Sequence, residues 1–262
     1  MRKIETSRLS ERDSALEARL ATALGADRRG EVYAFAHVSS TMDVAHTIGK
    51  EGTLVWAERQ EQGRGRQGRA WESPQGGAYF SIIVRPARSA AEIPQLSLVA
   101  GLAAAEAIRE CAMLSPRVRW PNDLLLGGKK LAGILTEARN GVVVIGIGIN
   151  VTTPPSELPD VATSLDAAGG KNLDPLHLTV RVYRRLFRWY DVWAGDGFAP
   201  IREALRPQMA LFGEPVHISA GTERFEGTAS DLDEAGRHVV RLDSGITRQF
   251  EMGEVTLLQS SP

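Results

Sequence analysis

Cysteine, long apolar runs and metal-ligand patterns are all scarce in this sequence. Cys111 is the one cysteine among 262 residues, so a disulfide within the chain and a cysteine-rich zinc site are both excluded. The five histidines show no metal-ligand spacing, which argues against a histidine metal site. No apolar run approaches the ~20 residues that a membrane-spanning helix needs.

An excess of one charge is also missing. The chain carries 31 lysines and arginines against 32 acidic residues, for a net charge of −1. A protein whose whole surface attracts nucleic acid needs a basic excess, so that class is disfavoured. Residues 1–5 lack the apolar segment of a secretory signal. We therefore expect a soluble, cytoplasmic globular protein, with no nucleic acid or membrane partner.

Glycine and arginine, in contrast, are concentrated at residues 62–69, which read QGRGRQGR. Apolar runs at 53–57 and 79–84 flank this stretch and predict strands, so the connection between them is far longer than usual. Three guanidinium groups repel one another unless an anion lies among them. The stretch therefore predicts a loop that binds a carboxylate or phosphate, with RNA binding and a flexible linker as alternatives.

The remaining pattern predicts helices and strands along most of the chain, followed by a run of short strands. Ser10 and Asp13 resemble a capping box for the first helix, and Asp174 with Pro175 begins a later one. The expected helices are 10–24, 42–49, 95–113, 174–193 and 200–205; the expected strands are 32–36, 53–57, 79–84, 118–120, 124–126, 129–137, 142–150, 216–218, 225–229, 238–242 and 246–250.

Residues 124–150 predict an antiparallel meander of three strands joined by tight turns, because Gly-Gly and Asn-Gly pairs separate the apolar runs. The last strand, 142–150, is almost wholly apolar, as expected at the centre of a sheet. Its two glycines, Gly146 and Gly148, lie on one face and would open space there for a ligand or a closely packed element. Pro121 must interrupt the strand before the meander or place it at an edge.

Four segments in register resemble the motif series of biotin protein ligases. They are Gly63–Arg69, Arg119–Asp123, Lys130–Leu135 and Gly146–Asn150. Their order and rough spacing also match, so the resemblance covers most of the chain. It implies an α+β fold in which a mixed, largely antiparallel central sheet with flanking helices forms a class II synthetase-like catalytic domain over 1–207. A small C-terminal SH3-like β-barrel over 208–262 would complete the chain.

The resemblance implies a two-step reaction with ATP and biotin as substrates and Mg²⁺ as cofactor. Biotin and ATP would form biotinyl-5′-AMP and pyrophosphate. The ε-amine of a lysine on a biotin carboxyl carrier protein domain, of acetyl-CoA carboxylase or a related carboxylase, would then attack the mixed anhydride. About 30 residues precede the first core strand, too few for the DNA-binding domain of some members, so no repressor function is expected. An exposed sheet edge would permit a homodimer.

The motif positions assign site residues by resemblance. The catalytic group would be Arg64, Arg66 and Lys130; the biotin-binding group would be Ser40, Thr41, Gln60, Gly63, Arg64, Gly65, Arg66, Trp71, Lys130 and Gly133; and the ATP-binding group would be Arg66, Arg69, Asn122, Asp123 and Asn150, with Mg²⁺ near Asp123.

Several of these residues also have a structural interpretation. Lys130 suits an exposed hairpin lysine, Trp71 suits core packing, and Ser40 and Thr41 suit the cap of a helix. Two positions depart from the family pattern: Arg119 stands where lysine is commonest, and Met42 where asparagine is frequent. A lipoate ligase or octanoyltransferase of the same superfamily is the nearest alternative, and an RNA-binding protein is the alternative from another class.

Overall fold

A seven-stranded mixed sheet forms the body of the protein in the computed structural model, which describes residues 11–220, 222–251 and 254–257. The strand order is β1-β2-β3-β7-β6-β5-β4. β1 and β2 run parallel, and the other pairings are antiparallel. The α+β fold with a largely antiparallel central sheet is confirmed. The strands are β1 Val32–Val38, β2 Leu54–Gln60, β3 Gly77–Val84, β4 Arg117–Arg119, β5 Asp123–Leu126, β6 Lys129–Arg139 and β7 Val142–Asn150.

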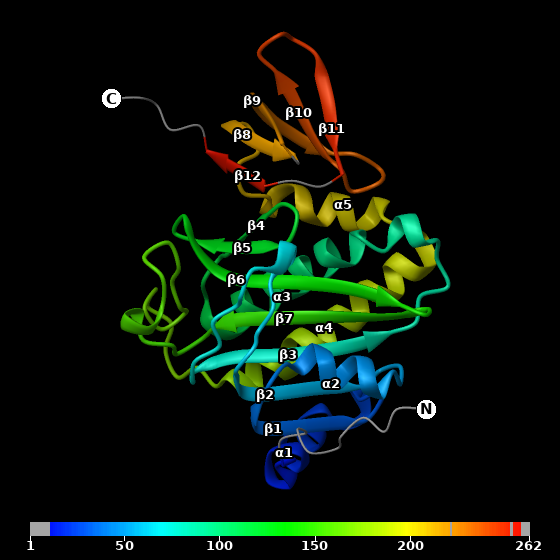
Figure 1. Ribbon diagram of the computed structural model, residues 1–262, viewed down its shortest axis with the longest axis vertical. Coiled ribbons are helices and arrows are strands. Elements are labelled where there is room, and N and C mark those ends of the chain that lie inside the picture. Colours follow the sequence, from blue (N-terminus) through cyan, green and yellow to red (C-terminus); the bar gives the residue numbers. More distant parts are fainter. Residues whose placement is uncertain (1–10, 221, 252–253, 258–262) are drawn as a thin grey trace.

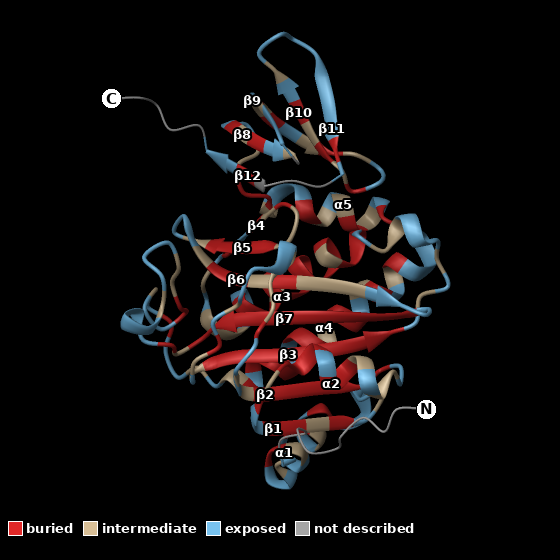
Figure 2. Cartoon of the chain, viewed as in Figure 1, coloured by how far each residue is buried: buried red, intermediate tan, exposed pale blue. Residues whose placement is uncertain are grey.

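The meander from β5 to β7 places the most apolar strand at the centre, as predicted. β7 is buried along its whole length, as is its neighbour β3 (Figure 2). Gly127 and Gly128 both have positive φ, as do Asn140 and Gly141, which suits the tight turns at the two hairpins. β4 lies at the sheet edge and ends before Pro121, in agreement with the loss of a backbone donor there.

Helices cover the two faces of this sheet unequally (Figure 1). α1 (Ser14–Leu24), α3 (Gln95–Ala112) and α4 (Pro175–Asp196) contribute to the larger apolar core on one face. The single short helix α2 (Thr41–Ile48) contributes to a smaller core on the other. Much of that second face is therefore left for the glycine–arginine loop.

The helix ends follow the predicted capping chemistry with one correction. Asp174 accepts a hydrogen bond from the Leu176 amide, 2.9 Å, and Pro175 begins α4. The N-cap of α1 is Asp13, whose carboxylate accepts from two backbone amides. The predicted partner Ser10 lies outside the described residues. Asp13 therefore acts as the cap itself, because its short carboxylate reaches the first amides directly.

A second, five-stranded antiparallel sheet lies beyond α5 (Ala199–Leu205), at one end of the molecule (Figure 1). Its order is β11-β10-β9-β8-β12, and the predicted short strands are present. Sequence reasoning missed the last strand, because four residues near the chain end carry too little pattern. The strands are β8 Pro215–Ala220, β9 Glu223–Leu232, β10 His238–Leu242, β11 Thr247–Phe250 and β12 Glu254–Leu257.

An aromatic stack joins the two sheets. His238 of β10 lies between Trp120 and Phe212, with ring centroids at 5.3 Å and 5.9 Å. The Trp120 indole donates to the Gly236 carbonyl at 3.1 Å. Since Trp120 belongs to the motif Arg119–Asp123, the C-terminal sheet packs directly against one of the four motifs.

In the part of the chain described here, no helix has the length and apolar character needed to cross a membrane.

Candidate active site

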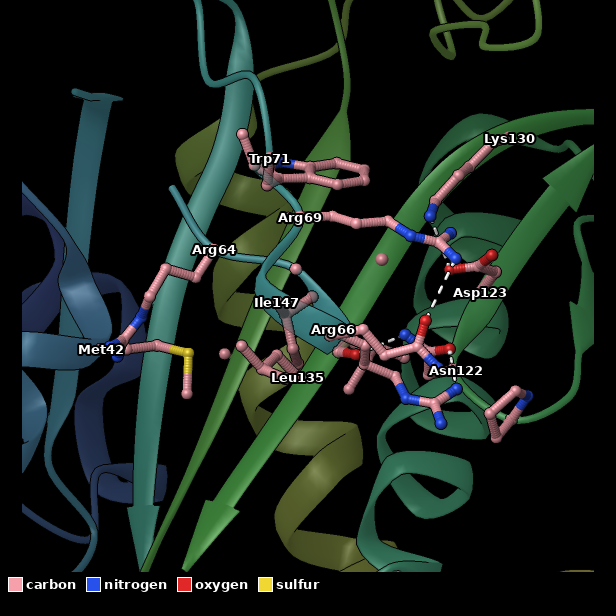
Figure 3. A pocket seen from close by; sticks show the side chains of 18 of the residues that line it. Met42, Arg64, Arg66, Arg69, Trp71, Asn122, Asp123, Lys130, Leu135 and Ile147 are labelled. Atoms are coloured by element: carbon pink, nitrogen blue, oxygen red, sulfur yellow. Dashed lines mark hydrogen bonds and ion pairs between the residues drawn. The ribbon is translucent and has the colours of Figure 1, made fainter. Parts of the chain in front are cut away.

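A pocket opens on the face of the sheet that carries α2, beneath the glycine–arginine loop (Figure 3). Most residues predicted for the site line it. They are Ser40, Thr41, Gln60, Arg64, Gly65, Arg66, Arg69, Trp71, Asn122, Asp123, Lys130 and Gly133. Segments between residues 40 and 133 therefore meet in one place, as the motif series predicted.

The loop has a defined backbone closure. The Gly65 amide donates to the Arg69 carbonyl at 2.7 Å, and the Trp71 amide donates to the Gly63 carbonyl at 2.9 Å. Gly63 does not line the pocket: a Cβ built on it would lie 2.3 Å from the Trp71 carbonyl oxygen. This close backbone contact leaves no room for a side chain at position 63, so glycine there allows the loop to close.

Trp71 and Met42 fill the space that the sheet glycines leave open. A Cβ at Gly148 would lie 2.4 Å from the Trp71 Nε1, and a Cβ at Gly133 would lie 2.9 Å from the same indole. At Gly146 the obstructing atom is the Met42 Sδ, 2.7 Å away. The glycines thus let two large side chains lie flat on the sheet, where they build an apolar floor and wall for the pocket.

Asp123 forms the charged end of the pocket between two cations. Its carboxylate pairs with Arg119 Nη2 at 2.6 Å and with Lys130 Nζ at 2.8 Å. Lys130 Nζ also lies 5.3 Å from the centre of the Trp71 ring. Arg66 Nη1 donates to the Asn122 Oδ1 at 3.2 Å. Arg119 therefore keeps a positive charge at this position and forms a second ion pair with Asp123.

A polar cluster lies at the other end of the pocket. The Gln60 Oε1 accepts from the Thr41 amide at 2.9 Å and from the Thr41 hydroxyl at 3.0 Å. The same hydroxyl meets the buried Ser81 hydroxyl at 2.9 Å. Ser40 is the N-cap of α2, yet its side chain makes no capping hydrogen bond. The Ser40 and Thr41 hydroxyls therefore line the pocket, and Ser40 does not cap α2 through its side chain.

Asn150, which was predicted to bind ATP, lies outside the pocket lining. It is buried, and its amide donates to the Thr163 carbonyl at 3.0 Å. That segment pins Lys130: the Lys130 amide donates to the Val161 carbonyl at 2.8 Å, and the Thr163 amide donates to the Lys130 carbonyl at 2.9 Å. The connector between β7 and α4, residues 151–174, thus fixes the backbone of Lys130 through Val161 and Thr163, a function that its sequence did not indicate.

Arg64 lines the pocket, but its guanidinium group turns away from the other two arginines. Figure 3 shows its side chain directed toward Met42, whereas Arg66 and Arg69 extend toward Asn122 and Asp123. Its Nη2 lies 3.0 Å from an Asp43 carboxylate oxygen and 3.5 Å from Glu137 Oε2. Neither acid was singled out from the sequence.

Apolar lining residues were also missed by sequence reasoning. Phe80, Leu135 and Ile147 come from β3, β6 and β7, and Val255 comes from β12 of the C-terminal sheet. Phe80 and Ile147 lie in apolar runs of strands that are buried along their whole length, so nothing in the sequence separates them from core residues. Val255 brings the second sheet to the pocket rim, which no local signal could indicate.

Comparisons with known proteins agree with this geometry. Residues 34–153 match the Biotin/lipoate A/B protein ligase family. A bifunctional ligase/repressor BirA of Bacillus subtilis is 35% identical over 227 residues, covering 81% of this chain and 70% of the relative. A biotin--[acetyl-CoA-carboxylase] ligase of Paracoccus denitrificans is 34% identical over 205 residues, covering 73% and 85%. The structure of the biotin protein ligase from Aquifex aeolicus in complex with biotin and ATP superposes with a TM-score of 0.78 at 30% identity, covering 87% and 99%.

A mixed sheet with a loop-covered pocket, together with these identities, defines the class of protein. The chain belongs to the biotin/lipoate A/B protein ligase family. Relatives named biotin--[acetyl-CoA-carboxylase] ligase and the superposed biotin protein ligase support the same conclusion: the protein is an enzyme, a ligase.

Proposed function

We propose that the enzyme activates biotin with ATP to biotinyl-5′-AMP and transfers the biotinyl group to one lysine of a biotin carboxyl carrier protein domain. The observation that carries this proposal is the arrangement of Trp71 and Lys130. The indole lies on the sheet at Gly133 and Gly148, and the ammonium group lies over its ring, 5.3 Å from the centre. Biotin joins a bicyclic ring system to an apolar alkyl chain that ends in a carboxylate, so its apolar part and its charge suit that pairing of indole surface and ammonium group.

The first step brings two anions together, the biotin carboxylate and the α-phosphate of ATP. Lys130 and Arg66 would offset that repulsion and stabilise the charge that develops as pyrophosphate leaves. Arg69 would face the phosphates. Lys130 would leave Asp123 for the substrate carboxylate, while Arg119 keeps Asp123 paired. Because two cations pair with Asp123, Lys130 can leave this carboxylate while Arg119 still neutralises it.

The polar cluster would recognise the biotin head group. Thr41 and Gln60 already share a hydrogen bond, so a ligand would find donors and acceptors whose orientation is fixed. Ser40 adds a buried hydroxyl beside them. Biotin carries a ureido group, which both donates and accepts, and this mixed set of groups suits it.

Mg²⁺ would enter with ATP as part of the substrate. Asp123 is the carboxylate in the pocket lining, and both of its oxygens are paired with cations. Among the described residues, no group of three or more potential metal ligands from His, Cys, Asp and Glu comes together. We therefore infer that the triphosphate supplies most of the ligands, with Asp123 or Asn122 positioning the nucleotide.

The acceptor would be the carrier domain of acetyl-CoA carboxylase or a related carboxylase, as the names of the relatives suggest. We further propose that residues 1–207 form the catalytic unit and that residues 208–262 form a separate small unit. The stack of His238 on Trp120 supports a role for the second unit in holding the Asn122–Asp123 segment.

The test is ATP–pyrophosphate exchange measured with biotin and, in parallel, with lipoate. The proposal predicts exchange that depends on biotin. Exchange with lipoate alone would reassign the enzyme to the lipoate branch of the same family.

A further inference from the structure

The Arg64 side chain is held by two carboxylates from different elements. Asp43 comes from the first turn of α2, and Glu137 comes from β6, the strand that also carries Lys130. The nearest nitrogen–oxygen distances are 3.0 Å and 3.5 Å. Arg64 itself belongs to the loop, so this contact joins the loop, the helix and the sheet.

Glu137 is the centre of a wider cluster of charged and titratable groups. Its Oε2 also lies 3.0 Å from His46 Nε2 and 3.0 Å from Arg139 Nη2. The side chains of Glu137 and His46 are 23% and 11% exposed, so these contacts are partly shielded from solvent. Several donors on one oxygen fix the Glu137 carboxylate in place, which makes it a rigid anchor for the mobile end of a long arginine side chain.

Arg64 lies within the part of the loop that is closed by backbone hydrogen bonds. Arg64 and Ala70 form a bridge across the loop, and Gly65 donates to Arg69. Glycines on both sides give the chain few other constraints. Fixing the Arg64 side chain therefore restricts the following loop residues, from which Arg66 and Arg69 extend toward Asn122 and Asp123.

We propose that Asp43 and Glu137 are positioning residues that form an acidic clamp for Arg64, and that Arg64 anchors the loop over the site instead of contacting the reacting groups. This inference rests on the proposed function for its kinetic consequence. The clamp holds the loop closed over the adenylate, which must be kept from water until the acceptor lysine arrives. Neither acid touches the reacting groups, so the clamp affects retention and binding more than the chemical step.

The decisive experiment compares Asp43→Asn, Glu137→Gln and the double variant with the wild-type enzyme. The amide side chains keep size and remove charge. Two partly exposed ion pairs predict that the double variant releases biotinyl-5′-AMP roughly tenfold faster and raises the biotin KM by a similar factor. The kcat of biotin-dependent pyrophosphate exchange is expected to change less than twofold. The control is Glu203→Gln on α5, which removes a carboxylate paired at 3.4 Å with Arg206 away from the pocket.

A coupling measurement separates the clamp from a general weakening of the structure. Arg64→Gln added to the double variant is expected to cause no further increase in adenylate release, because its partners are already gone. An equal additional increase would show that Arg64 acts through other contacts and would overturn the clamp.

Hydrogen exchange of the loop amides tests the clamp independently of catalysis. The Gly65 and Trp71 amides are expected to exchange several-fold faster in the double variant than in the wild type and the Glu203→Gln control. Unchanged exchange together with unchanged adenylate retention would overturn the inference. If the wild-type enzyme shows no biotin-dependent exchange of pyrophosphate, the proposed function fails, while the amide measurement still decides whether the clamp exists.

Discussion

Replacement of His238 by phenylalanine tests how the C-terminal sheet is attached to the catalytic sheet. The imidazole is 1% exposed, and neither ring nitrogen has a hydrogen-bond partner among the described residues. Burial lowers the pKa of His238 from 6.5 to about 4. The folded protein therefore keeps this side chain neutral at pH values where the unfolded chain already binds a proton.

The sign of the pH dependence follows from this difference. Between pH 6.5 and 4 the unfolded state binds more protons than the folded state, so the free energy of unfolding falls as the pH is lowered. At pH 8 the titration of His238 does not change the free energy of unfolding. At pH 5 it is expected to have lowered the free energy of unfolding of the wild-type protein by about 2 kcal/mol. The full loss below pH 4 would approach about 3 kcal/mol.

His238→Phe keeps an aromatic ring between Trp120 and Phe212 and removes the titration. Urea unfolding followed by tryptophan fluorescence at pH 8, 7, 6 and 5 measures the effect. The variant is expected to be more stable than wild type by about 1 kcal/mol at pH 8, because two unpaired buried nitrogens are gone, and the gap should widen by about 2 kcal/mol at pH 5. His177→Gln, at an exposed position of α4, is the control. Parallel pH profiles for wild type and His238→Phe would refute the reasoning.

Three further predictions concern the pocket. Arg66→Gly removes the contact with Asn122 and should release biotinyl-5′-AMP into solution, as measured in an ultrafiltrate; unchanged retention would contradict the role of the loop as a lid. Gly148→Ala places a Cβ 2.4 Å from the Trp71 indole, so the ring must shift and the biotin Kd in calorimetry should rise at least tenfold, whereas Gly195→Ala, with nothing within 4 Å, should leave it unchanged. Lys130→Ala should slow adenylate formation by roughly 10²- to 10³-fold in rapid-quench experiments, and a near-normal rate would remove Lys130 from the chemistry.

Much of the fold could be predicted because its local signals agree with one another. Gly127-Gly128 and Asn140-Gly141 fix two turns, and the almost wholly apolar run between 142 and 150 predicts a buried strand, so the meander and its central strand follow. The last strand, β12, could not be predicted, since its four residues gain their place only by pairing with β8.

The site was predictable to the extent that motifs carry it. The loop arginines, Trp71 and Lys130 meet in one pocket as expected. The direction of the Arg64 side chain was not predictable, because it depends on acids contributed by a helix and a distant strand. Asn150 has the same limitation: a motif gives its identity, but its contact with Thr163 arises from the path of the connector.

The proposed reaction activates biotin and passes it to a carrier lysine. The most direct measurement combines the purified enzyme with biotin, Mg-ATP and a biotin carboxyl carrier domain, followed by mass spectrometry of the carrier. We expect a mass increase of one biotinyl group on a single lysine, dependent on ATP and absent when that lysine is replaced by arginine. An unmodified carrier with active biotin-dependent pyrophosphate exchange would contradict the transfer step, and the absence of both would contradict the claim as a whole.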